Sequence, residues 1–362
     1  MRKLWLRLLL IVIGALLVCL AIPVGLELYQ RHQAQRELDE VVTSLDQADP
    51  RWRLEHVEAD RIQVAPEKNS AVTIAAAASL LPAEWKPETY DEVLNVRLPV
   101  EFTEEQADRL TKELQAVAAA VQKARLLKDQ PVGRHPLKYT PNWIETLVPH
   151  VHQTRTIASL LELDVRDSAH RKDIRQAWES SRALLNSGRS LVDEPLLISV
   201  LVRIAIDAYA INSLERALAQ GEFLPAQLQE MQEGLEEEAA SPLFLPGIRG
   251  ERAGIHLVVT NIASGKISIA DLATLGHKNG RDNTSWADPI YMFFAHSMVL
   301  KSHATILRRE TEMVEAAKQP PAERYTALMD IDDSVRAALL PNDRSQILAR
   351  LLLPAVVKLC SG

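Results

Sequence analysis

The chain has 362 residues with 48 acidic and 41 basic side chains, which gives a formal net charge of −7 and an isoelectric point near 5.9. This acidic balance, without a Lys/Arg cluster interleaved with aromatic residues, argues against nucleic acid as a partner. The two cysteines, Cys19 and Cys360, are too few for a disulfide framework or a cysteine-based zinc site.

A long apolar run opens the chain, from Leu4 to Leu26. At about 1.5 Å of helical rise per residue, its roughly 23 residues span about 34 Å, which matches the hydrocarbon core of a bilayer. We therefore predict a transmembrane anchor over residues 1–28 that spans the membrane once.

Charges at the two ends of this run predict its orientation. Arg2, Lys3 and Arg7 lie at its start, whereas Glu27 follows its end. The positive-inside rule then places the N-terminus in the cytoplasm and the rest of the chain outside the cytoplasmic (inner) membrane.

Two other interpretations of the apolar run are a cleaved signal peptide and a lipoprotein signal. Cleavage is disfavoured because no Ala-x-Ala pattern occurs near Ala21. Lipidation at Cys19 is disfavoured because Val18, not a small residue, precedes the cysteine and the apolar run continues beyond it. An uncleaved signal-anchor is the favoured interpretation.

Residues 29–100 are predicted to form a stalk helix and a collar of short pieces. Ala34, Leu38, Val41 and Leu45 follow heptad spacing, which indicates that the anchor helix continues outward. This short stripe favours a helix laid on the protein's own body over a two-stranded coiled coil. Asp49-Pro50 should end the helix. The collar holds Trp52, Trp85, five prolines and an alanine-rich helix at 70–81.

Residues 101–362 are predicted to form a helical extracytoplasmic domain. Thr103 and Gln106 have the spacing of a capping box, and apolar residues follow on one helical face. Those residues are Ala107, Leu110, Leu114, Val117, Val121 and Ala124. Further helices are expected over 142–163 and 168–187, with Gly188 as the C-terminal cap of the latter.

A central helix is expected between Pro195 and Gly221. Its segment 196–218 is apolar nearly all round, which predicts burial on every side. The segment is long enough for a second membrane span, but its charged residues would make insertion cost several kcal/mol.

The later helices are predicted over 225–240, 248–264, 289–318, 322–340 and 343–359. No run shows strand alternation with hairpin turns, so the fold class is all-α. The chain should be a single transmembrane helix followed by an irregular multi-helix array, α-solenoid-like or a bundle. It is repeat-like in its helix pairs, but no repeat signature recurs at a fixed period.

Known catalytic motifs are absent from the sequence, so no catalytic, cofactor-binding or metal-binding residue is assigned and no cofactor is expected. His150 and His152 point to different sides of a helix and are interpreted as surface residues. His296 and His303 share a helical face, but no carboxylate accompanies them at ligand spacing.

One polar cluster is singled out as a candidate site. Arg203 and Asp207 stand four apart on an otherwise apolar helix, so they should be buried and paired. The other candidate members, expected to lie beside them, are Arg249, Glu251 and Arg252. A buried structural ion network is the favoured interpretation, and a ligand-binding pocket is the alternative.

Four stretches together resemble an uncharacterised family of membrane-anchored helical proteins of planctomycete bacteria. They are Trp52–Glu55, Glu67–Ala71, Leu191–Gly221 and Arg249–Ala253. The resemblance implies an anchored helical fold and names no chemistry. Family members continue beyond the last helix, so it also implies that this chain is truncated or divergent after Cys360.

These observations favour a non-enzymatic, membrane-tethered interaction or scaffold protein of the cell envelope. The expected partners are the membrane, through the N-terminal helix, and an unidentified protein. One alternative is a hydrolase-like or ligand-binding protein with an Arg/Asp/Glu site in the helical domain. A second alternative is a component of a secretion apparatus.

Overall fold

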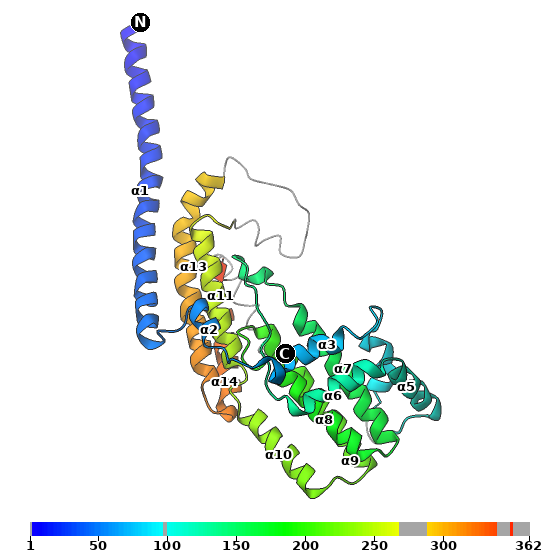
Figure 1. Ribbon diagram of the computed structural model, residues 1–362. Helices are drawn as coiled ribbons and strands as arrows, with labels where there is room; N and C mark the ends of the chain where they lie inside the picture. Colours follow the sequence, from blue (N-terminus) through cyan, green and yellow to red (C-terminus); the bar gives the residue numbers. More distant parts are fainter. Residues whose placement is uncertain (1, 97–99, 268–287, 339–347, 350–362) are drawn as a thin grey trace.

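The computed structural model describes residues 2–96, 100–267, 288–338 and 348–349. Within these ranges all regular secondary structure is helical, as the absence of strand alternation predicts. Figure 1 shows one long N-terminal helix that projects from an array of shorter helices. The predicted fold class, all-α with an N-terminal apolar helix followed by a multi-helix array, is confirmed.

The N-terminal helix α1 runs without interruption from Arg2 to Ala48. Its apolar part is long and apolar enough to cross a membrane, and none of that stretch is buried in the protein. The later part of the helix lies alongside α13 (Asp288–Ala317), as Figure 1 shows. Glu27 is in contact with Ser297 of α13. The helix ends directly before Asp49-Pro50, as expected.

The heptad stripe of α1 packs on the protein's own body. Ala34, Leu38 and Leu45 are buried in one cluster with apolar residues of α13. The α13 members of this cluster are Leu300, Ala304 and Leu307. The stripe is therefore an intramolecular contact.

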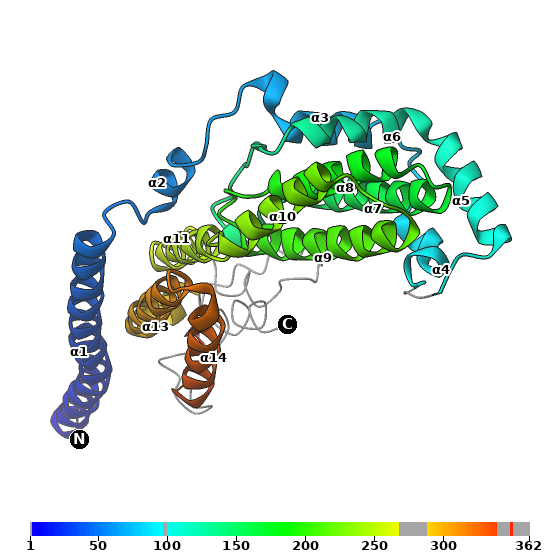
Figure 2. The ribbon, with the colours of Figure 1, turned by 90° about the horizontal axis from the view of Figure 1, so that it is seen from below.

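Short elements follow α1 and lead across the body. They are α2 (Leu54–Ala59), η1 (Pro66–Lys68), α3 (Ser70–Ala78), η2 (Pro87–Tyr90) and α4 (Asp91–Leu94). Figure 2 shows them running from the end of α1, over the top of the body, to its far side. Pro66 and Pro87 occupy the first positions of η1 and η2, where the missing N–H of proline is tolerated.

Helices α5 (Glu104–Ala116) and α6 (Ala118–Arg125) form the predicted amphipathic segment. Thr103 and Gln106 make both hydrogen bonds of the capping box. Val117 leaves helical geometry, so the segment is two helices rather than one. All six of its predicted core residues are buried.

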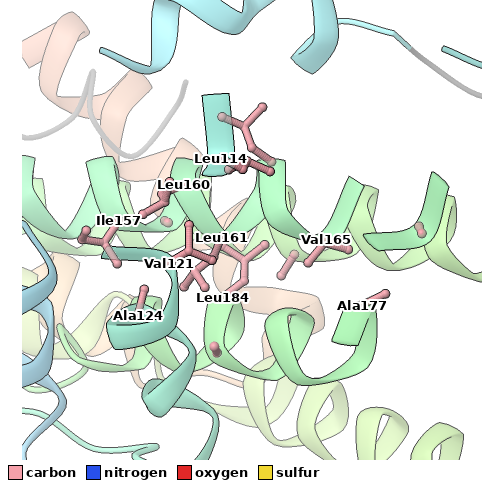
Figure 3. Close-up of a cluster of buried hydrophobic side chains, with 14 of the residues drawn as sticks. Leu114, Val121, Ala124, Ile157, Leu160, Leu161, Val165, Ala177 and Leu184 are labelled. Atoms are coloured by element: carbon pink, nitrogen blue, oxygen red, sulfur yellow. The ribbon is translucent and has the colours of Figure 1, made fainter. Parts of the chain in front are cut away.

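The largest core lies where α5 and α6 meet α7 (Pro149–His170) and α8 (Ile174–Arg189). Figure 3 shows side chains of all four helices meeting there. The helix predicted over 142–163 is in fact a short turn, η4 (Trp143–Glu145), followed by α7. The helix starts later because Pro149 occupies its first position, where the missing N–H costs nothing.

Gly188 does not cap α8, contrary to the prediction. It lies inside the helix, and a Cβ there would stand 3.1 Å from the Ile206 side chain of α9. Glycine at this point allows α8 and α9 to pack closely, and no left-handed turn is involved.

Helix α9 (Leu197–Gln220) crosses beneath α7 and α8, with α3 and α6 on the opposite side of that layer (Figure 2). It is not buried on every side, contrary to the prediction, because Ile198, Ile211 and Leu218 are each over two-fifths exposed. Helix α9 lies at the edge of the layer formed with α7 and α8, so among the described residues no helix packs against one of its sides. Its length and composition would also suit a membrane span, but Arg203 and Arg216 within it are buried against protein groups.

The remaining described helices are α10 (Pro225–Ala240), α11 (Leu245–Ala263), α13 and α14 (Pro321–Ala338). A second core joins the start of α9 to α11, α13 and α14. The bounds of these helices lie within three residues of those predicted. The last predicted helix, 343–359, lies almost wholly outside the described residues.

Candidate functional site

The candidate polar cluster is divided among separate interfaces. Arg203 binds Glu238 of α10, and Arg189 of α8 donates to the same carboxylate at 2.5 Å. The expected pair of Arg203 with Asp207 is therefore wrong. Oδ1 of Asp207 has no hydrogen-bond partner among the described residues, and burial raises the pKa of Asp207 to about 7, with the nearby Glu238 charge as the second cause.

Arg249 and Arg252 bind a different element from Arg203. Both contact Asp49, which directly follows α1, at 3.3 Å and 2.5 Å respectively. Arg252 is almost completely buried and lies over the Trp52 ring. These contacts fasten α11 to the end of α1.

Glu251 pairs neither with Arg203 nor with Arg249 and Arg252. It accepts hydrogen bonds from the backbone N–H of Leu197 at 3.1 Å and from Nε1 of Trp143 at 3.3 Å. Leu197 begins α9, so the carboxylate satisfies a free N–H at the positive end of that helix. Burial raises the pKa of Glu251. Four of the five residues thus make three separate structural contacts, Asp207 makes none of them, and no single site in the described part of the chain encloses Arg203 and Arg249.

A different group of polar residues does converge. His135 comes from the loop before α7, His150 from the first turn of α7, and Glu194 from the turn between α8 and α9. One potential ligand atom of each lies within 4.8 Å of the other two. Nε2 of His150 is 3.0 Å from Glu194, and the two imidazole rings are stacked at 4.6 Å.

The surroundings hold this group in place. Ser199 donates a hydrogen bond to Glu194 at 2.5 Å, and His135 contacts Ser190 Oγ at 3.3 Å. Burial lowers the pKa of His135 to about 4, so the ring is neutral near pH 7. Arg61 donates to the carbonyl of His135.

A pocket of about 710 Å³ opens beside the two histidines. Its wall includes both rings, apolar residues of α3 such as Ala71 and Val72, and Leu147. Two imidazoles and a carboxylate can hold a divalent metal ion or transfer protons. The arrangement therefore combines reactive polar groups with a mostly apolar cavity, which is typical of small-molecule sites.

Sequence reasoning missed this group. The spacing of His150 and His152 predicts that both are surface residues. In the structure His152 is exposed, but His150 is half-buried against Glu194. The three residues lie on three separate elements, so no spacing pattern connects them. His303 likewise contacts His256 at 2.9 Å rather than sharing a site with His296.

A second cavity, of about 580 Å³, lies between η2, α4, α7 and α9. Arg166 and Arg216 line it. Arg166 pairs with Glu162 at 2.7 Å, while Arg216 donates to the backbone carbonyls of Val96 and Val100.

Comparison with protein-family models, with curated proteins and with solved structures gives no match for this chain. Its function is therefore argued from its own residues.

Proposed function

We propose that this chain is a single-pass membrane-tethered protein that holds its helical domain on the outer side of the cytoplasmic membrane. There it acts as an interaction or scaffold protein of the cell envelope. The supporting observation is the contrast within α1: the apolar stretch that begins at Leu9 is unburied, while the continuation of the helix packs on α13. Burying each large apolar side chain is worth about 1.5–3 kcal/mol, so a bilayer is the environment that suits the bare segment.

Glu27 supports a membrane boundary at the end of the apolar segment. Its carboxylate is buried and accepts hydrogen bonds from the backbone N–H and the hydroxyl of Ser297, at 3.0 Å and 2.9 Å. The contact with α13 therefore begins directly where the apolar segment ends. Because α1 is one continuous helix, the proposed membrane segment leads directly into the domain and holds it close to the membrane surface.

The charges flanking the segment support the orientation. Arg2, Lys3 and Arg7 at the near end favour a cytoplasmic N-terminus.

A surface for a protein partner is offered by a groove of about 790 Å³ between α1, α13 and α14. Val41, Leu45 and Ile331 contribute to its apolar wall, and charged residues such as Glu40 and Arg308 are also among its lining residues. An apolar centre with a polar rim is the usual anatomy of a protein interface.

Thiol labelling of intact spheroplasts tests the topology. The full chain carries Gln232→Cys, an exposed position on α10, with Cys360→Ser as background. We expect a membrane-impermeant maleimide to label the introduced thiol on α10 without lysis, while an N-terminal epitope tag stays protected from external protease. Labelling only after lysis would contradict the orientation, and extraction of the chain by carbonate would contradict the span.

The group of His135, His150 and Glu194 favours a second function, binding or hydrolysis of a small ligand in the domain. The sequence attaches this alternative to Arg203 and Glu251, but those residues form separate structural contacts. The pocket beside the histidines is the better location. If the ligand binds beside the histidines, His150→Ala should lose binding of the small ligand and Arg249→Ala should leave it unchanged. The opposite result would favour the arginine location.

A further inference from the structure

We propose that His135, His150 and Glu194 bind one divalent transition-metal ion, most suitably zinc, with an open coordination position toward the adjoining pocket. This inference is independent of the membrane tether. It assigns a ligand to residues that no sequence motif connects.

The donor atoms fit zinc in kind. Two imidazole nitrogens and one carboxylate oxygen are a ligand set of zinc centres that keep a fourth position for water or substrate. Calcium and magnesium prefer oxygen donors alone, and a soft ion such as Cu(I) prefers sulfur. A ligand set rich in imidazole therefore favours an ion of intermediate softness, such as zinc.

The distances also fit. Zinc bonds of about 2.0–2.2 Å in a tetrahedron separate the ligand atoms by about 3.3 Å. His150 and Glu194 already lie 3.0 Å apart, and all three ligand atoms lie within 4.8 Å of one another. The two rings are stacked, so at least one imidazole must rotate to aim its lone pair at a shared ion.

Glu194 supplies the second observation that points to a ligand. Its side chain is fully buried, and its Oε1, although 3.0 Å from Nε2 of His150, makes no aligned hydrogen bond among the described residues. A buried carboxylate with a free lone pair is costly unless a cation or a donor satisfies it. Within the described part of the chain, the well-aligned contacts of the carboxylate are on Oε2, from His150 and Ser199.

Outer contacts orient the ligands as in metal sites. Ser190 gives its hydrogen to the carbonyl of Ser187 at 2.7 Å, so it can only accept from His135. His135 then carries its proton on Nε2 and keeps a lone pair on Nδ1. Ser199 steadies Glu194 in the same way.

The local charge permits a cation. Arg61 lies next to His135, but it is paired with Asp193 at 3.4 Å and with Glu58 at 3.3 Å. Glu194 therefore stays available to balance part of the metal charge. Access is direct because both histidines line the pocket.

Zinc titration of the detergent-solubilised full chain tests the proposal. After treatment with chelator and dialysis, we expect the chain to bind one Zn²⁺, and Co²⁺ in its place should give the visible absorption of a tetrahedral site. Glu194→Gln should weaken Zn²⁺ binding by at least about 100-fold, beyond the roughly 10–100-fold typical of losing an outer contact. Ser199→Ala should fall within that smaller range.

The matched control is His152→Ala, which removes an exposed histidine two positions from His150 and should leave binding unchanged. Circular dichroism of each variant separates loss of a ligand from loss of the fold. If Glu194→Gln does not fold, His150→Ala at the pocket wall provides the same comparison. The proposal is overturned if the parent chain binds no stoichiometric Zn²⁺, or if the folded ligand variants bind it as tightly as the parent.

Discussion

Buried arginines of this protein mostly find their carboxylates on neighbouring elements. Arg203 of α9 binds Glu238 of α10, and Arg252 of α11 binds Asp49 after α1. A residue that is buried at a helix–helix interface faces the neighbouring helix, so its partner comes from that side more readily than from its own turn. The pairing of Arg166 with Glu162 on α7 shows that an i,i+4 pair forms when both face the same neighbour.

Removing Glu238 should destabilise the fold. Glu238→Ala leaves Arg203 buried without its carboxylate, while Arg189 keeps the exposed Glu237 and the carbonyl of Gly234. We expect a loss of about 3 kcal/mol in the free energy of unfolding. This is the lower end of the usual range because Asp207 stays nearby as a partial replacement. Urea denaturation followed by circular dichroism measures the loss.

The matched control for this prediction is Glu237→Ala on the same helix. The Glu237 side chain is 73% exposed, against 12% for Glu238. Its removal should change stability by no more than about 0.5 kcal/mol. Equal losses in the two variants would show that the buried network contributes nothing specific.

At the scale of elements, two glycines of α11 allow neighbouring segments to pack closely against this helix. A Cβ on Gly250 would lie 1.9 Å from the carbonyl oxygen of Pro195, and one on Gly254 would lie 2.1 Å from the Trp143 ring. These positions lie on one face of the helix, where the chain entering α9 and the turn η4 pack against it. The same close approach brings Glu251 to the first N–H of α9.

Gly250→Ala should therefore destabilise the protein by about 3 kcal/mol or more, because backbone rather than a flexible side chain must move. Gly234→Ala on α10 is the matched control, since its Cβ would meet Leu185 at an ordinary 3.7 Å. There the better helix propensity of alanine should stabilise the protein by about 0.5–1 kcal/mol. Thermal unfolding of both variants decides the matter; a neutral Gly250→Ala would contradict this account of the contact.

At the scale of the whole molecule, α1 has an exposed apolar part and a part that packs on the domain. From Leu9 the apolar stretch of the first part is unburied, whereas the second part is one wall of the cluster with α13. The helix is continuous across the boundary at Glu27. In the function proposed above, it serves both as the membrane anchor and as a packed helix of the domain.

Truncations at two points should separate these roles. Deleting residues 1–25 should leave a soluble, mainly helical protein with its stability retained. Deleting 1–48 also removes Leu38 and Leu45, whose burial contributes about 1.5–3 kcal/mol each, and uncovers the α13 residues beneath them. Circular dichroism and the unfolding midpoint measure the difference; equal midpoints would show that α1 beyond Glu27 adds nothing to the fold.

The sequence by itself determined what depends on neighbouring residues along the chain. The apolar run, the helix periodicity, the capping box at Thr103 and the stop at Asp49-Pro50 predicted α1, the all-α class and most helix bounds. These features are local because helix hydrogen bonds and caps join residues only three or four apart.

Only the tertiary structure decided which distant residues meet. It paired Arg203 with Glu238, made Gly188 a packing position, left one side of α9 exposed and brought His135 and His150 to Glu194. Periodicity shows that a helix has a buried face, but it does not show which helix covers that face. Contacts between residues far apart in the chain follow from the packing of whole elements, and a single sequence carries no local signal for them.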